Sequence, residues 1–102
     1  MASFNEIIQS HPLVLVDFSA EWCAPCKTLT PILQQVKEEK GDGLKIVKID
    51  VDKNNELASS YEVLGVPTMI LYKDGKQVWR QSGVLSREEL ISVIDSKTTQ
   101  AA

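Results

Sequence analysis

The chain has 102 residues, of which 43% are hydrophobic and 25% charged, and its formal net charge is −3. These values are typical of one globular domain that can bury a core without disulfide or metal staples. The acidic charge gives no reason to expect nucleic acid or an anionic membrane as a partner, and no apolar run is long enough to span a bilayer. We therefore expect a single domain over residues 1–102, with a flexible tail at 97–102.

The first half of the chain predicts two helices that alternate with two strands. Ser3 and Glu6 have the spacing of a capping box, which opens a short helix. A nearly continuous apolar run over 13–18 predicts a strand that is buried on both faces. Apolar residues at helical spacing predict a helix over 24–40, and residues 44–51 form the second predicted strand.

The second half predicts a helix, a hairpin and a final helix. Asn54 can cap a short helix, and residues 68–72 predict a strand. Asp74-Gly75 is a hairpin signal that returns the chain through 77–81. Ser86-Arg87-Glu88-Glu89 is a second capping box and opens the last helix.

This order of elements predicts the fold class. Helices and strands that alternate along the chain give a three-layer α/β fold, with a mixed sheet between helices on both faces. Right-handed crossovers make the first strands parallel, and the hairpin supplies an antiparallel edge.

The only two cysteines, Cys23 and Cys26, lie where the first strand gives way to the second helix. Side chains three positions apart at a helix start share one face, so the two thiols can bridge each other. Cys23 is nearest to the unpaired N–H groups and the positive end of the helix dipole, which favour its thiolate. We therefore predict thiol–disulfide exchange, in which Cys23 attacks and the deeper Cys26 resolves.

Other interpretations of the cysteine pair stay open. Free cysteines are often inert core residues. A zinc site needs four ligands, and because the lone His11 lies at the far end of the first strand, such a site would require a dimer. The domain could also be a binding module in which the redox state of the pair acts as a switch.

The cysteine content also bears on location. Two cysteines in a chain whose start shows no signal peptide favour redox chemistry in a reducing compartment over a structural bridge. We therefore expect a cytoplasmic protein.

A longer pattern surrounds the cysteine pair. It comprises Asp17-Phe18-Ser19-Ala20-Glu21-Trp22-Cys23-Ala24-Pro25-Cys26-Lys27, then Pro31, Lys48-Ile49-Asp50, Gly65-Val66-Pro67-Thr68 and Gly83. In this order and spacing the chain resembles the thioredoxin family over residues 3–96. The resemblance implies the thioredoxin fold and a protein-disulfide reductase activity, with no bound cofactor and no metal. An oxidant or isomerase is the alternative within the same chemistry.

The chain departs from the family pattern in three places, one of which is Ser19, at a position that is Trp in many bacterial members. It begins where the family's first helix would, so the additional N-terminal strand of most thioredoxins is expected to be absent. Four strands are then expected, in the spatial order 44–51, 13–18, 68–73, 76–81. Lys45 and Lys48 could protect the edge strand from pairing with another chain, and we expect a monomer. Ala24 stands where most thioredoxins carry Gly, a change that should leave the reaction type unaltered.

Asp17 and Lys48 are the candidate proton-handling residues. Asp17 lies in an apolar strand, six positions before Cys23. Burial would raise its pKa through desolvation, so that it could take a proton from Cys26 near neutrality. The alternative is a carboxylate at a strand end that reaches solvent. The resemblance implies that Lys48 sits near this carboxyl and tunes it, whereas a solvated edge lysine is the alternative.

The resemblance also implies a substrate-docking surface beside the cysteines. The Val66–Pro67 bond would be cis, which leaves the backbone of Val66 free for a β-like contact with an extended substrate. The implied surface comprises Trp22, Ala24, Pro25, Val66, Pro67, Gly83 and Val84. Trp22 could instead pack in the core, and Gly83 could simply end a strand. The implied partners are disulfide-containing client proteins and, as electron donor, an NADPH-dependent flavoenzyme, thioredoxin reductase.

Overall fold

One four-stranded sheet organises the part of the chain that the computed structural model describes, residues 3–98. The elements are α1 (Phe4–Gln9), β1 (Leu13–Ser19), α2 (Ala24–Lys40), a 3₁₀ turn (Gly41–Gly43), β2 (Leu44–Asp50), α3 (Asn55–Ser60), β3 (Thr68–Lys73), β4 (Lys76–Ser82) and α4 (Arg87–Thr98). The strand order is β2-β1-β3-β4, with β1 and β2 parallel and the other pairs antiparallel. The predicted three-layer α/β fold and strand order are confirmed.

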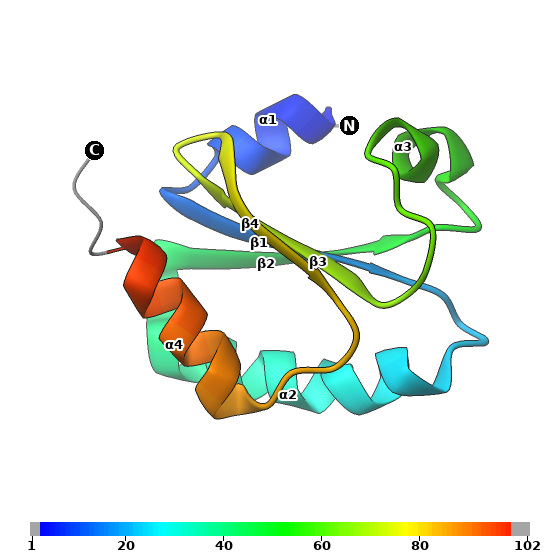
Figure 1. Cartoon of the computed structure of the whole chain (residues 1–102). Coiled ribbons are helices and arrows are strands. Elements are labelled where there is room, and N and C mark those ends of the chain that lie inside the picture. The colour runs from blue at the N-terminus through cyan, green and yellow to red at the C-terminus, as the bar shows by residue number, and fades with distance from the viewer. Residues whose placement is uncertain (1–2, 99–102) are drawn as a thin grey trace.

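The helices cover both faces of the sheet. α2 and α4 lie on one face and α1 and α3 on the other (Figure 1). Because successive side chains of a strand point to opposite faces, Leu15 and Val16 of β1 enter two different core clusters. Leu15 joins Leu29 and Leu90 on the α2 and α4 side, while Val16 joins Ala58 on the α1 and α3 side. All seven residues of β1 are buried, which explains why the strand is apolar except at Asp17 and Ser19.

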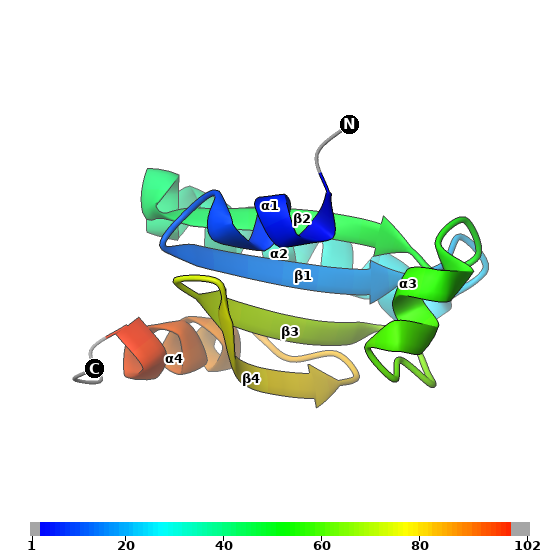
Figure 2. The same ribbon diagram turned by 90° about the horizontal axis from the view of Figure 1, so that it is seen from above.

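The two edge strands are more exposed than the two central strands. β2 and β4 flank the buried pair β1 and β3, as the view from above shows (Figure 2). The hairpin between β3 and β4 turns at Asp74 and Gly75, with φ values of 51° and 83°. Positive φ at both central residues is typical of a type I′ turn and accounts for Gly75. A Cβ on Gly75 would also lie only 2.9 Å from Cγ of Gln9.

Both predicted capping boxes form. The Ser3 hydroxyl accepts the backbone N–H of Glu6 at 3.2 Å, and the Glu6 carboxylate reaches back to the hydroxyl and backbone N–H of Ser3. At the start of α4, the Ser86 hydroxyl accepts the N–H of Glu89 at 3.1 Å, and the Glu89 carboxylate accepts the N–H of Ser86 at 3.0 Å. These reciprocal bonds pair N–H groups that a helix start leaves without partners.

Two sequence predictions are wrong in detail. Asn54 precedes α3 as expected, but its side chain donates to the Asp50 carbonyl at 2.9 Å instead of capping the helix. Lys97 and Thr98, expected in a tail, belong to α4. The Lys73 ammonium donates to the Lys97 carbonyl at 3.2 Å and the Thr98 hydroxyl bonds back into the helix, so both residues are held. The rest of that predicted tail, 99–102, lies outside the described residues.

The end of α4 lies beside the start of β1. Thr98 lines one cavity together with Pro12 and Leu13, and with Asp74 of the hairpin. Within residues 3–98, no helix combines the length and the apolar character that crossing a membrane requires.

Candidate redox site

The two cysteines form a disulfide at the start of α2. Cys23 is the N-cap residue, with extended backbone, and Cys26 lies in the first turn with its Cα 5.3 Å from that of Cys23. Ala24 and Pro25 begin the helix between them, where a proline is tolerated because its missing N–H would have had no helical partner. The predicted bridging of the two sulfurs is therefore confirmed.

The helix start directs a donor at the first sulfur. The backbone N–H of Cys26 donates to Sγ of Cys23 at 3.2 Å. The sulfur of Cys23 thus takes the place of the side-chain oxygen that usually caps a helix. Together with the positive end of the helix dipole, this hydrogen bond favours negative charge on Cys23. Cys23 and Cys26 are 3% and 1% exposed. The predicted order of shelter holds, but the difference between the two sulfurs is small.

A second loop reaches the disulfide from the far side of the sheet. The Val66–Pro67 peptide bond is cis, as the resemblance implied. The carbonyl oxygen of Val66 lies 3.7 Å from Sγ of Cys23, and Val66 packs against the two cysteines. Gly83, with φ of 92°, donates its N–H to the Pro67 carbonyl at 2.9 Å. Gly83 therefore does more than end β4, because it ties the chain after β4 to the Val66–Pro67 loop.

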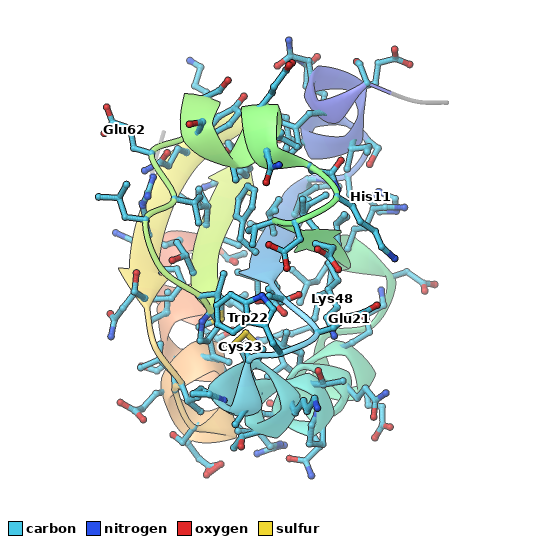
Figure 3. The ribbon with its side chains drawn as sticks, turned by 90° about the vertical axis from the view of Figure 1, so that its right-hand side faces the viewer. His11, Glu21, Trp22, Cys23, Lys48 and Glu62 are labelled. Carbon is cyan, nitrogen blue, oxygen red and sulfur yellow. A yellow bond between two sulfur atoms is a disulfide. The ribbon has the colours of Figure 1, made fainter. Side chains whose placement is uncertain are left out.

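Most of the residues predicted for docking are accessible around the disulfide. Trp22 is 70% exposed, so the core alternative for this residue is wrong, and its indole N–H donates to Asp52 at 2.8 Å. The side chain lies beside Cys23 at the surface of this end of the molecule (Figure 3). We call the accessible set the docking face; it comprises Trp22, Ala24, Pro25, Val66, Gly83 and Val84. Pro67 is buried, so it shapes the loop beneath this face and does not present its ring on it.

Asp17 is fully buried on the α2 side of the sheet. Its side chain is 0% exposed, and neither carboxyl oxygen has a hydrogen-bond partner within residues 3–98. Burial raises the pKa of Asp17 from 3.8 to about 6, and the positive charge of Lys48 offsets part of that rise. The alternative in which this carboxylate reaches solvent is therefore wrong. A buried acid that titrates near neutrality can exchange protons at physiological pH.

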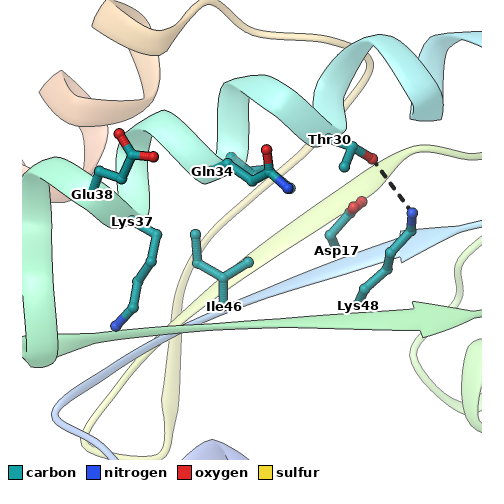
Figure 4. Close-up of a pocket in the computed structure, with 8 residues that line it drawn as sticks. Asp17, Thr30, Gln34, Lys37, Glu38, Ile46 and Lys48 are labelled. Atoms are coloured by element: carbon teal, nitrogen blue, oxygen red, sulfur yellow. Dashed lines mark hydrogen bonds between the residues drawn. The ribbon is translucent and has the colours of Figure 1, made fainter.

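Asp17 faces a cavity of about 390 Å³ between α2 and β2. The lining includes Thr30 and Gln34 from α2, and Ile46 and Lys48 from β2 (Figure 4). Lys48 also lines a neighbouring cavity of about 600 Å³ that reaches Cys26. This lysine therefore lies between the surroundings of the buried acid and those of the second cysteine.

Lys48 is exposed yet not simply solvated. Its ammonium donates to the Thr30 hydroxyl at 3.4 Å. Among the described residues it makes no ion pair with Asp17, whose carboxyl has no hydrogen-bond partner. His11 lies at the opposite end of β1, beside Ser10, and takes no part in the site.

Three residues of this region were missed by the sequence analysis. Asp52 holds Trp22, and Thr30 holds Lys48, through contacts between segments that no local spacing predicts. Leu64 is 98% exposed in the loop that leads to Val66 and Pro67. The sequence gives no signal for this exposure, because Leu64 follows the apolar Val63 and precedes Gly65.

Comparison with known proteins places this site in a family. A family model described as Thioredoxin matches residues 1–96. The chain is 46% identical over 86 residues to thioredoxin from Listeria monocytogenes, which covers 84% of each protein. It is 45% identical over 86 residues to thioredoxin from Bacillus subtilis, covering 84% of this chain and 83% of the relative. With thioredoxin Y, a chloroplastic rice protein, it shares 44% identity over 96 residues, but spans only 57% of that protein's length.

Solved structures agree with these relatives. The fold is similar to that of a mutant thioredoxin from Halobacterium salinarum, with a TM-score of 0.86 and 38% identity over 96% of this chain and 85% of the other. It is also similar to chloroplastic thioredoxin z, with a TM-score of 0.86 and 33% identity over 93% of this chain and 86% of the other.

Proposed function

This chain belongs to the thioredoxin family, and from that premise we propose how its residues divide the work of protein-disulfide reduction. The protein is a thiol–disulfide oxidoreductase whose Cys23–Cys26 pair cycles between disulfide and dithiol. The observation on which the assignment of roles depends is the position of the disulfide, capped by the Cys26 N–H and in contact with the Val66 carbonyl.

Cys23 is the attacking thiol in this proposal. Its thiolate, favoured by the helix start, attacks one sulfur of a client disulfide, forming the Cys23–client bond and breaking the client's S–S bond. The leaving client sulfur takes up a proton. The docking face supports this step, since an extended client segment laid across it can pair with the backbone of the half-buried Val66.

Cys26 then resolves the mixed disulfide. Its thiol passes a proton to the Asp17 carboxylate, and the resulting thiolate attacks Sγ of Cys23. The Cys23–Cys26 bond forms and the bond from Cys23 to the client breaks. The second client sulfur leaves as a thiolate and takes up a proton, so the client is released with two thiols. Two electrons have then passed from this protein to the client. The proposed role of Asp17 as proton acceptor is supported by its burial and its raised pKa. Lys48 is proposed to tune this acid, because it lines both the cavity that Asp17 faces and the cavity that reaches Cys26.

A trapping experiment tests the two cysteine roles. Cys26→Ser should accumulate a mixed disulfide with insulin on a non-reducing gel, because the attacking thiol remains and the resolving thiol is gone. Cys23→Ser is the matched control and should give no such band. A band with Cys23→Ser and none with Cys26→Ser would reverse the assignment, and insulin reduction by the double Ser variant would contradict a redox role for the pair.

Re-reduction and location complete the proposal. An NADPH-dependent thioredoxin reductase of the flavoenzyme class would return two electrons to the disulfide. The protein would then act as an electron carrier in redox homeostasis, because repeated turnover needs a supply of reductant. The cytoplasm is the proposed location, since it is a reducing compartment. Insulin reduction that proceeds equally well without NADPH, in a purified mixture with such a reductase, would overturn this recycling route.

A further inference from the structure

One hydroxyl on α2 links the resolving cysteine to the lysine beside the buried acid. Thr30 follows Cys26 by one helical turn, and its hydroxyl donates to the Cys26 carbonyl at 3.1 Å. The same oxygen accepts from the ammonium of Lys48 at 3.4 Å (Figure 4). A hydroxyl has one hydrogen to donate and lone pairs to accept, so both bonds can exist together.

The second bond determines where a flexible positive charge rests. A lysine side chain loses up to about 2 kcal/mol of conformational entropy when it is fixed, so water alone does not hold an exposed ammonium in one place. Lys48 has Thr30 as a partner beside the cavity that Asp17 lines, and the Asp17 carboxyl makes no hydrogen bond to any residue that the structure describes. The ammonium therefore acts on the acid through space, from a position that the hydroxyl sets.

The other charged residues near Asp17 do not bring a positive charge to its carboxyl. Lys37 and Glu38 of α2 line the same cavity, but the Lys37 ammonium donates to the carbonyls of Gly41 and Leu44 and points away from the acid. Glu38 is an exposed residue further along α2. On the other side, β3 pairs the uncharged Met69 with Asp17. Glu21, Lys27 and Asp50 line the neighbouring cavity that reaches Cys26, and none of the three lines the cavity that Asp17 faces.

We propose that Thr30 is a positioning residue for disulfide exchange, because its hydroxyl holds the Lys48 ammonium beside the carboxyl of Asp17. The inference rests on the proposed function, in which Asp17 takes the proton of Cys26. Without the hydroxyl, the ammonium has only apolar methyl groups at this point and moves out to water. The ionised form of Asp17 then loses part of its stabilisation, and the acid titrates at higher pH.

The test is a carboxyl ¹³C NMR titration of Asp17 in the oxidised protein. Thr30→Val, which keeps the shape and removes the hydroxyl, should raise the midpoint by about half a pH unit, a roughly threefold change in proton affinity. Thr30→Ser should restore the wild-type midpoint. Thr28→Val is the matched control, since Thr28 makes the same bond back along α2, to Ala24, without reaching Lys48. It should leave the midpoint unchanged.

A double variant separates positioning from a general effect on the helix. Lys48→Met should raise the midpoint by itself, and adding Thr30→Val should then change nothing further. An unchanged midpoint in Thr30→Val, or an equal rise with and without Lys48, would overturn the proposal. Failure of the proposed function shows elsewhere: Asp17→Asn would then resolve mixed disulfides at the wild-type rate, while the titration would still decide the role of Thr30.

Discussion

At the residue scale, the site depends on the carboxyl of Asp17, which folding buries without a hydrogen-bond partner in the described part of the chain. The sequence predicts Asp17 as a buried acid because a lone charge interrupts an apolar strand, and the structure confirms it. The residues that hold Lys48 and Trp22 in position could not be predicted. Thr30 and Asp52 contact Lys48 and Trp22 only after helices and strands have packed, and nothing in local spacing distinguishes them from other polar surface residues.

The buried carboxyl of Asp17 should make stability depend on pH in an unusual direction. Its pKa is about 6 in the folded protein, against 3.8 ordinarily, so the unfolded chain ionises it first. The folded state therefore loses stability as pH rises from about 4 to about 6, and the loss stays complete above that range. The difference corresponds to roughly 3 kcal/mol.

Asp17→Asn should accordingly raise the free energy of unfolding by up to roughly 3 kcal/mol at pH 8, and by little at pH 3. Urea unfolding of the oxidised protein at both pH values measures this. Asp42→Asn, at an exposed position in the turn after α2, is the control and should change stability little at either pH. Equal gains at pH 3 and pH 8 would show that charge is not the cause.

At the element scale, the fold was largely predictable because local signals agree with the packing. Largely apolar runs mark the two central strands, and Asp74-Gly75 marks the hairpin. The errors occur where a tertiary contact competes with a local preference. The Asn54 side chain donates to the carbonyl of Asp50 at the end of β2, and the ammonium of Lys73 from β3 donates to the carbonyl of Lys97 in α4.

The capping box of α4 should be measurable in stability. Ser86→Ala removes the acceptor for the N–H of Glu89 and should lower the free energy of unfolding by about 1 kcal/mol. Ser86→Thr keeps an acceptor oxygen and should cost less. Thermal unfolding of the three proteins under one buffer condition compares them, and equal loss in both variants would mean that the hydroxyl oxygen is not what matters.

At the scale of the whole molecule, three separate segments build the surroundings of the redox pair: the start of α2 and the Val66–Pro67 loop contact the cysteines, and the chain after β4 holds that loop through Gly83. A site fixed on several sides keeps its geometry when the sulfurs separate. The sequence could point to each segment only through the family resemblance, since composition and periodicity do not bring Gly83 and Pro67 together.

The reduction potential of the Cys23–Cys26 pair should identify the direction of electron flow. Thioredoxins work at about −270 mV, a value known for the family, and we expect a similar potential here. Equilibration against a series of dithiol redox buffers measures it, with the Cys23/Cys26 double Ser variant as a blank. A potential of about −180 to −120 mV would instead indicate an isomerase or an oxidant and would contradict the proposed reductase role.

Thr98, Pro12 and Leu13 line one cavity, so the end of α4 lies near the start of β1. The disulfide lies beyond the other end of that strand. Seven strand residues at roughly 3.3 Å each separate the two ends by about 20 Å. A protein immobilised on an electrode or bead through the end of α4 would thus turn its disulfide toward the solution. Orientation on a solid support comes from the topology itself, with no change near the cysteines.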